Sequence, residues 1–108
     1  MRRLVQKAKT VDCWGPNGTP NILIVAPPPI GEGVLTSPVA DEMGTMGTTC
    51  VEKSRRLASY YKLIAESEGV HFLDAAGCEF NSIDFMHLTA RGHQQLAQRL
   101  LELLPTIL

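Results

Sequence analysis

The sequence predicts an α/β fold with parallel strands, because helical and strand-like segments alternate along the chain. Apolar residues recur at helical spacing near the N-terminus, over about 50–68 and over about 89–104. Between these segments lie two short aliphatic runs, 22–26 and 70–73, of the kind found in buried parallel strands. Strands separated by helices form βαβ units with right-handed crossovers. Two strands make a small sheet, so we expect them to be part of a larger fold.

Length and charge exclude several classes of protein. The 108 residues allow one small domain, 1–108. Ten Lys and Arg against eleven Asp and Glu give a net charge of −1, whereas sequence-independent nucleic-acid binding needs a basic surface. No apolar run approaches the about 20 residues that cross a bilayer. We therefore expect neither a nucleic-acid partner nor a membrane span.

The N-terminal segment is basic but lacks the apolar core of a signal peptide. Leu4, Val5, Ala8 and Val11 follow a helical period, and no capping residue stands before Leu4. The chain is therefore expected to begin inside an element. The lack of a signal peptide in this segment then does not decide whether one precedes it. A cytoplasmic location is favoured and secretion is the alternative.

The remaining elements are expected from their start and stop signals. The segment 14–20 is a turn, and three prolines end the strand 22–26. Residues 30–48 form a long loop, which in a small domain is often functional. Thr49 and Glu52 have capping-box spacing, so a helix is expected from about Cys50 to Glu68, with Gly69 after it. The last helix is expected from about Thr89, with Pro105 beyond its end.

The candidate chemistry lies just before the last helix, in Asp84-Phe85-Met86-His87. Ligands of open parallel sheets bind beyond the carboxyl ends of the strands, where this segment is expected. Asp and His three residues apart in a turn present their side chains on one side. The carboxylate then accepts from Nδ1–H of the imidazole and leaves Nε2 available as a general base. The alternative is an aspartate that caps the last helix beside an exposed histidine.

Four segments resemble the C-terminal half of the SGNH hydrolases, also called GDSL-type lipases or esterases. They are Ile-Leu-Ile-Val-Ala-Pro-Pro-Pro at 22–29, Ser-Arg-Arg-Leu-Ala at 54–58, Phe-Leu-Asp-Ala at 72–75, and Asp-Phe-Met-His-Leu-Thr-Ala-Arg-Gly-His at 84–93. The resemblance implies a partial three-layer α/β/α fold, flavodoxin-like in outline, with its first strands missing. It also implies that Asp84 and His87 are the orienting acid and the base of a Ser-His-Asp triad. The substrate would be a small carboxylic ester in the complete enzyme, hydrolysed without a cofactor.

The chain departs from the family pattern in ways that bear on activity. The Gly-Asp-Ser-Leu motif with the nucleophilic serine is absent, as are the glycine and asparagine of the oxyanion hole. Phe85 stands where the family often has glycine, which affects how His87 is presented. Four serines were considered as nucleophiles, and none of them lies in a nucleophile-like strand-to-helix turn: Ser37, Ser54, Ser67 and Ser82. The chain alone is therefore expected to be nearly inactive on simple esters.

Other sites are possible but weaker. Gly31-Glu32-Gly33 lacks the third glycine and the following helix of a dinucleotide loop. The odd cysteine count suggests three reduced thiols, Cys13, Cys50 and Cys78, of which the last two are also candidate nucleophiles. Asp74 either caps the next loop or contacts substrate. Met43 and Met46 either line an acyl pocket or are exposed. A metal site could be assembled only from scattered residues: His71, His87, His93, Asp74, Asp84 and Cys78.

The rival function is a non-catalytic α/β module that serves in binding or assembly. A sheet edge left open by missing strands is a template for strand pairing, so self-association is expected in that case. A flavodoxin-like nucleotide binder would need a phosphate-cradling loop, which the sequence lacks.

Overall fold

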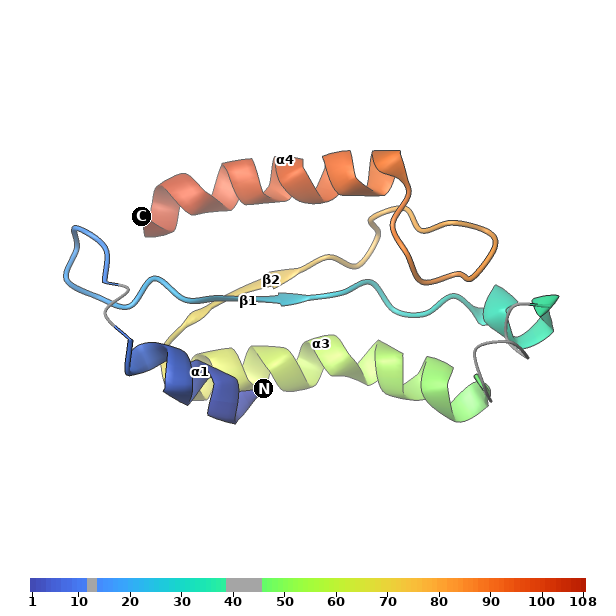
Figure 1. Cartoon of the computed structure of the whole chain (residues 1–108), viewed down its shortest axis with the longest axis horizontal. Coiled ribbons are helices and arrows are strands. Elements are labelled where there is room, and N and C mark those ends of the chain that lie inside the picture. The colour runs from blue at the N-terminus through green and yellow to red at the C-terminus, as the bar shows by residue number, and fades with distance from the viewer. Residues whose placement is uncertain (12–13, 39–45) are drawn as a thin grey trace.

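The computed structural model describes residues 1–11, 14–38 and 46–108. Their secondary structure comprises α1 (Arg2–Lys9), β1 (Leu23–Ala26), the 3-10 helix η1 (Glu32–Thr36), α3 (Thr48–Glu68), β2 (His71–Asp74) and α4 (Ala90–Ile107). The strands pair in parallel, with Leu23 opposite His71 and Ala26 opposite Asp74. Figure 1 shows three layers, with α4 on one face of the strands and α1 and α3 on the other. The predicted α/β class with parallel strands is confirmed.

Apolar side chains join the sheet to the layer of α1 and α3. Val5 of α1, Ile24 of β1 and Ala65 of α3 form one buried cluster. Tyr61 and Phe72 pack against it from α3 and β2. The β-branched run that predicted β1 therefore contributes Ile24 to this face.

The ends of α3 follow the sequence signals only in part. Gly69 ends the helix in the left-handed conformation, with φ 64°, as its position predicted. The predicted capping box is wrong: α3 begins at Thr48, after the N-cap Gly47, and no side chain caps it. Thr49 therefore lies inside the first turn rather than ahead of it.

The two terminal helices also differ in detail from expectation. Thr89 caps α4 as predicted, and its side chain accepts from Gly92 N. Pro105 lies inside α4, not beyond it: it removes one backbone N–H donor from the helix, and the buried Ile107 packs the last turn. Helix α1 ends at Lys9, so Val11 lies outside it and is 57% exposed.

The connections show more order than their composition suggested. Trp14 and Pro20 bridge the predicted turn, and Gly18 takes φ 70° within it. Helix η1 interrupts the long loop predicted over 30–48. Residues 12–13 and 39–45, with Cys13 and Met43, lie outside the described residues.

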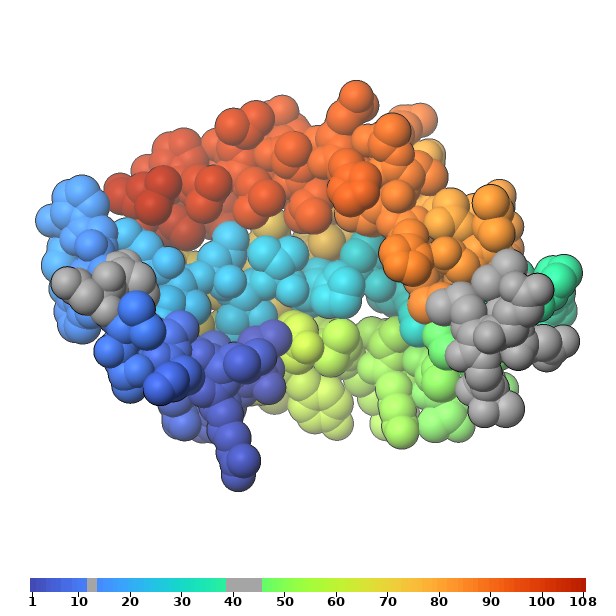
Figure 2. All heavy atoms as spheres, viewed as in Figure 1, coloured from blue at the N-terminus to red at the C-terminus, as the bar shows by residue number. Residues whose placement is uncertain are grey.

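Among the described residues, no strand pairs with the outer edge of β1. The described sheet has the order β1-β2, so each strand has a single neighbour within it. Figure 2 shows the cyan band around β1 between the red helix layer above and the blue and green layer below. Within the described ranges, no helix has the length and apolar character that a membrane crossing requires.

Candidate functional site

The connections that follow the two strands meet at one end of the sheet. Both strands run in the same direction, so their carboxyl ends lie together (Figure 1). The segment after β1 leads into η1, and Gly31 N of that segment donates to Phe85 O of the segment after β2, at 2.9 Å. The chain thus brings its candidate residues to the edge where parallel sheets bind ligands.

Asp84 and His87 are joined through their side chains. The distance from His87 Nδ1 to Asp84 Oδ2 is 2.7 Å. An ionised carboxylate only accepts hydrogen bonds, so Nδ1 carries the hydrogen and donates. The His87 side chain is 75% exposed and that of Asp84 is 18% exposed. The imidazole therefore reaches solvent while its carboxylate partner stays largely covered.

Backbone amides hold the other carboxylate oxygen. Asp84 Oδ1 accepts from Met86 N at 2.9 Å and from His87 N at 3.0 Å. These amides, with the His87 ring as a further donor, hold the pKa of the Asp84 carboxyl well below its ordinary value. Asp84 is therefore ionised over the whole neutral range and available to orient the imidazole.

Asn81 organises the same turn, a role that the sequence reasoning missed. Its Oδ1 accepts from Ile83 N and from Asp84 N, both at 2.8 Å. Its main-chain N donates to His87 O at 2.9 Å, so the turn closes on itself. Asparagine commonly accepts from amides two and three residues ahead, and that local signal was present in the sequence.

Phe85 adopts a backbone conformation that favours glycine. Its φ is 58°, and among the described non-glycine residues it alone has a positive φ. The turn thus holds a phenylalanine in a backbone conformation that glycine takes readily, and the Asp84–His87 hydrogen bond forms around it.

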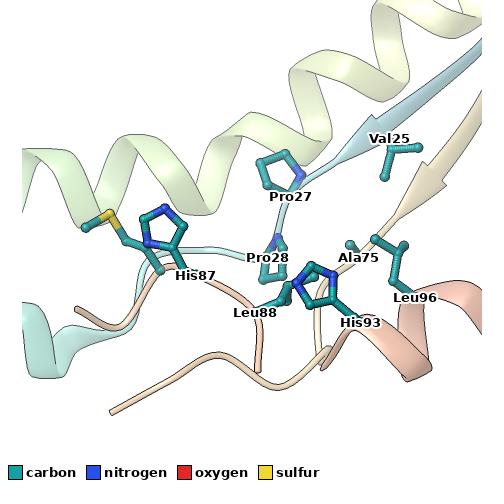
Figure 3. Close-up of a pocket in the computed structure, with 9 residues that line it drawn as sticks. Val25, Pro27, Pro28, Ala75, His87, Leu88, His93 and Leu96 are labelled. Carbon is teal, nitrogen blue, oxygen red and sulfur yellow. The ribbon is translucent and has the colours of Figure 1, made fainter. Parts of the chain in front are cut away.

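A pocket of about 360 Å³ opens beside His87. Figure 3 shows His87 and His93 on its wall beside Pro28 and Leu88, with Val25, Ala75 and Leu96 lining the far part. Apart from the two imidazoles, the lining side chains are apolar. His93, named above only as part of a scattered metal site, faces this pocket from the first turn of α4.

The serine hydroxyls lie elsewhere. None of the residues that line the pocket in the described structure is a serine. Three hydroxyls donate to backbone carbonyls: Ser37 to Ile83, Ser54 to Val51 and Ser67 to Ile64. The pair Asp84–His87 is therefore not joined to a serine by any of these bonds.

The described residues offer no metal centre. No group of three or more His, Cys, Asp or Glu side chains within them is placed to hold an ion. Cys78 is buried, and Cys50 lies in the first turn of α3. Neither cysteine lines the pocket with His87.

The other candidate residues have structural contacts. Asp74 Oδ1 accepts from Ala76 N at 2.8 Å, so the carboxylate caps the turn after β2. Met46 packs against the buried cluster of Val34 and Val51; the methionine at the pocket is Met86, which no sequence signal singled out. Gly31 lies against the ring of Phe80, and Gly33 lies against the ring of Phe85.

Two solved structures resemble the chain over nearly all its length. One is a protein from Agrobacterium tumefaciens str. C58 that carries the provisional name arylesterase; it is 33% identical with a TM-score of 0.75, over 100% of this chain and 49% of its own. A second crystal structure is 27% identical with a TM-score of 0.69, over 94% of this chain and 47% of its own. No protein-family model and no curated protein sequence matches.

The chain spans about half the length of each of these proteins. The match to the first covers the described strands, helices α1, α3 and α4, and the turn that carries Asp84 and His87, because it includes every residue. The chain thus has an esterase-like α/β fold.

Proposed function

We propose that this chain is the C-terminal part of a carboxylic-ester hydrolase of the SGNH, or GDSL-type, family. His87 is the general base and Asp84 is the residue that orients it. The observation that carries the proposal is the 2.7 Å contact between His87 Nδ1 and Asp84 Oδ2 at the rim of an apolar pocket. The arylesterase name of the Agrobacterium protein supports the class of reaction.

In this proposal Nε2 of His87 takes the proton of a serine hydroxyl as the serine oxygen attacks the ester carbonyl. The imidazole then gives that proton to the departing alkoxide. The alcohol is released and the acyl group remains on the serine. A water molecule repeats the exchange and releases the acid. Asp84 stabilises the imidazolium that forms at each step, and its low pKa keeps it charged while it does so.

The pocket suits the apolar portion of a small ester. Its volume of about 360 Å³ is in the range of small-molecule sites, and its lining is apolar apart from His87 and His93. A short acyl or aryl group against Val25 and Leu96 would place its ester linkage toward the imidazoles (Figure 3). His93 then supplies a hydrogen-bonding group beside the reacting atoms.

The serine and the oxyanion-hole donors would come from a segment that pairs with the open edge of β1. In a parallel pair, the backbone groups of alternate residues bond the neighbouring strand. The carbonyls of Ile22 and Ala26 accept hydrogen bonds from the β2 segment, so the backbone groups of Leu23 and Val25 point toward the outer edge of β1. A strand at that edge would end beside His87, because the carboxyl ends of parallel strands lie together. The half of the Agrobacterium protein that this chain does not match is the natural source of such a strand.

A chimera tests this function. The unmatched half of the Agrobacterium protein is joined ahead of Met1, and hydrolysis of p-nitrophenyl acetate is measured beside the chain alone. We expect turnover by the chimera and almost none by the chain. In the chimera, His87→Ala and Asp84→Asn should each lower kcat by about 10³-fold or more.

His71→Ala is the matched control, because His71 lies at the opposite end of β2 from the site. Its kcat should stay within about threefold of the parent chimera. Turnover that survives His87→Ala, or robust turnover by the unjoined chain that His87→Ala abolishes, would contradict the proposal.

The second candidate function is a self-associating α/β module, and the observation that favours it is the same open edge of β1. In that case the strand that pairs with β1 belongs to a second copy of the chain. Light scattering over a range of concentrations separates the two: a dimer of the unjoined chain supports association. A strict monomer at high concentration would leave only the hydrolase.

A further inference from the structure

The turn that carries Asp84 and His87 packs against η1 (Glu32–Thr36) and the residue ahead of it. Phe85 O accepts from Gly31 N at 2.9 Å, directly ahead of η1. The Phe85 side chain packs against Val34 and Val51, which are 0% and 2% exposed. A residue between the acid and the base is thus anchored in a small core of its own.

The Phe85 ring fits beside η1 because two glycines there have no side chains. A Cβ on Gly33 would lie 2.2 Å from Cε1 of the Phe85 ring, closer than any real contact. A Cβ on Gly31 would lie 2.7 Å from Cε2 of Phe80 and 3.2 Å from Cβ of Phe85. The Gly31-Glu32-Gly33 segment, excluded as a dinucleotide loop, therefore forms a notch for Phe85, which we call the Gly33 notch.

The backbone of Phe85 needs such an anchor. L-residues other than glycine, asparagine and aspartate seldom adopt a φ of 58°, and such a conformation persists only where neighbouring contacts hold it. The same conformation turns the chain so that Met86 N and His87 N both point at Asp84 Oδ1. Loss of the anchor releases the turn on which those two bonds depend.

The notch is itself fixed to the rest of the molecule. Ile30 N donates to Ser54 Oγ of α3 at 2.9 Å, and Arg55 of α3 pairs with Glu32 at 2.6 Å. Ser37 Oγ donates to Ile83 O at 2.7 Å, so η1 holds the turn on the other side of Asp84 as well. These contacts connect α3, through η1, to the acid–base pair.

We propose that Phe85 is a positioning residue: its ring, seated in the Gly33 notch, holds the turn in which Asp84 and the His87 imidazole face one another. The consequence for catalysis rests on the proposed function. The positioning itself does not, because it concerns bonds within this chain.

The test is an NMR titration of the Asp84 carboxyl carbon in the full chain, in Phe85→Ala and in Gly33→Ala. In the parent, the pKa of Asp84 should lie well below its ordinary value, because amides of the turn bond the carboxylate. Both substitutions should move that pKa upward toward about 3.9. The His87 Nδ1–H signal should weaken in parallel. Gly47→Ala, where a new Cβ meets no described atom within 4 Å, should change neither signal.

The double variant Gly33→Ala/Phe85→Ala identifies the ring as the link. If a Cβ on Gly33 acts by expelling the Phe85 ring, the double variant should titrate like Phe85→Ala alone, with no further shift. Additive effects of the two changes would contradict the proposal.

Phe85→Gly separates the ring from the backbone. Glycine adopts the positive φ without cost and needs no ring to hold it, so we expect the pKa of Asp84 to stay lower in this variant than in Phe85→Ala. An Asp84 pKa that stays low in Phe85→Ala, which also serves if Gly33→Ala does not fold, would overturn the proposal. In the chimera, Phe85→Ala should lower kcat about tenfold with KM little changed. A chimera without activity would defeat the proposed function and leave the titration result standing.

Discussion

The two helical layers are attached to the strands in different ways. On one face, α1 and α3 meet the sheet through buried apolar side chains, among them Val5, Ile24 and Ala65. On the other face, polar bonds hold the first half of α4: Gln95 Oε1 accepts from Glu79 N at 2.8 Å, and Arg99 donates to the carbonyls of residues 74 and 76 at 2.7 Å.

The pocket and the acid–base pair lie on the side that hydrogen bonds organise. Apolar burial is strong but has no direction, whereas hydrogen bonds fix the distance and angle of the groups they join. The α3 layer is therefore expected to supply most of the stability. The α4 side, with the turn 81–87, supplies the geometry of the site.

The largest expected effect follows from removal of Ile24, which is 3% exposed. Ile24→Ala should lower the free energy of unfolding by about 2–5 kcal/mol, because it removes buried methyl groups and leaves a cavity. Urea denaturation measures the change. Leu63→Ala, on the 60% exposed Leu63 of α3, is the control and should change it by less than about 1 kcal/mol. Equal losses in the two variants would show that the α3 layer is not held by apolar burial.

A smaller effect is expected where α4 approaches the preceding loop. A Cβ on Gly92 would lie 2.0 Å from the backbone oxygen of Glu79, so the start of α4 must move away. Gly92→Ala should destabilise the protein by about 1–3 kcal/mol, although the same change stabilises an open helix by about 1 kcal/mol. Gln94→Ala, at an exposed position of the same helix, is the control. A gain of stability in Gly92→Ala would contradict the close approach.

The smallest effect concerns pH. The pKa of Asp84 is lowered by folding, so its contribution to stability is complete above its unfolded pKa of about 3.9 and is lost as pH falls through the folded value. Between about pH 5 and pH 2, the parent should therefore lose more stability than Asp84→Asn. Urea denaturation at a series of pH values gives the two slopes. Parallel slopes would show that Asp84 is not held by the turn.

The order of helices and strands could be predicted from the sequence because each signal for it was local. Aliphatic runs located both strands to within a residue or so, and Gly69 and Thr89 marked the ends of α3 and the start of α4. The spacing of Asp84 and His87 also suggested their hydrogen bond, which a turn of this size brings within reach.

The details that escaped depend on contacts between distant segments. Pro105 reads as a helix terminator unless the packing of Ile107 is known. His93 faces the pocket only because α4 docks beside β1, and Gly33 receives Phe85, 52 residues further along the chain, only in the folded protein. Contacts between residues so far apart in the sequence cannot be predicted from a local sequence pattern.

If Asp84 orients the His87 imidazole, the tautomer of that ring must show it. Nitrogen-detected NMR of the full chain, at a pH where the ring is neutral, distinguishes Nδ1–H from Nε2–H. We expect the hydrogen on Nδ1 in the parent chain and loss of that preference in Asp84→Asn. A ring protonated mainly on Nε2 in the parent would show that no base is presented to the pocket.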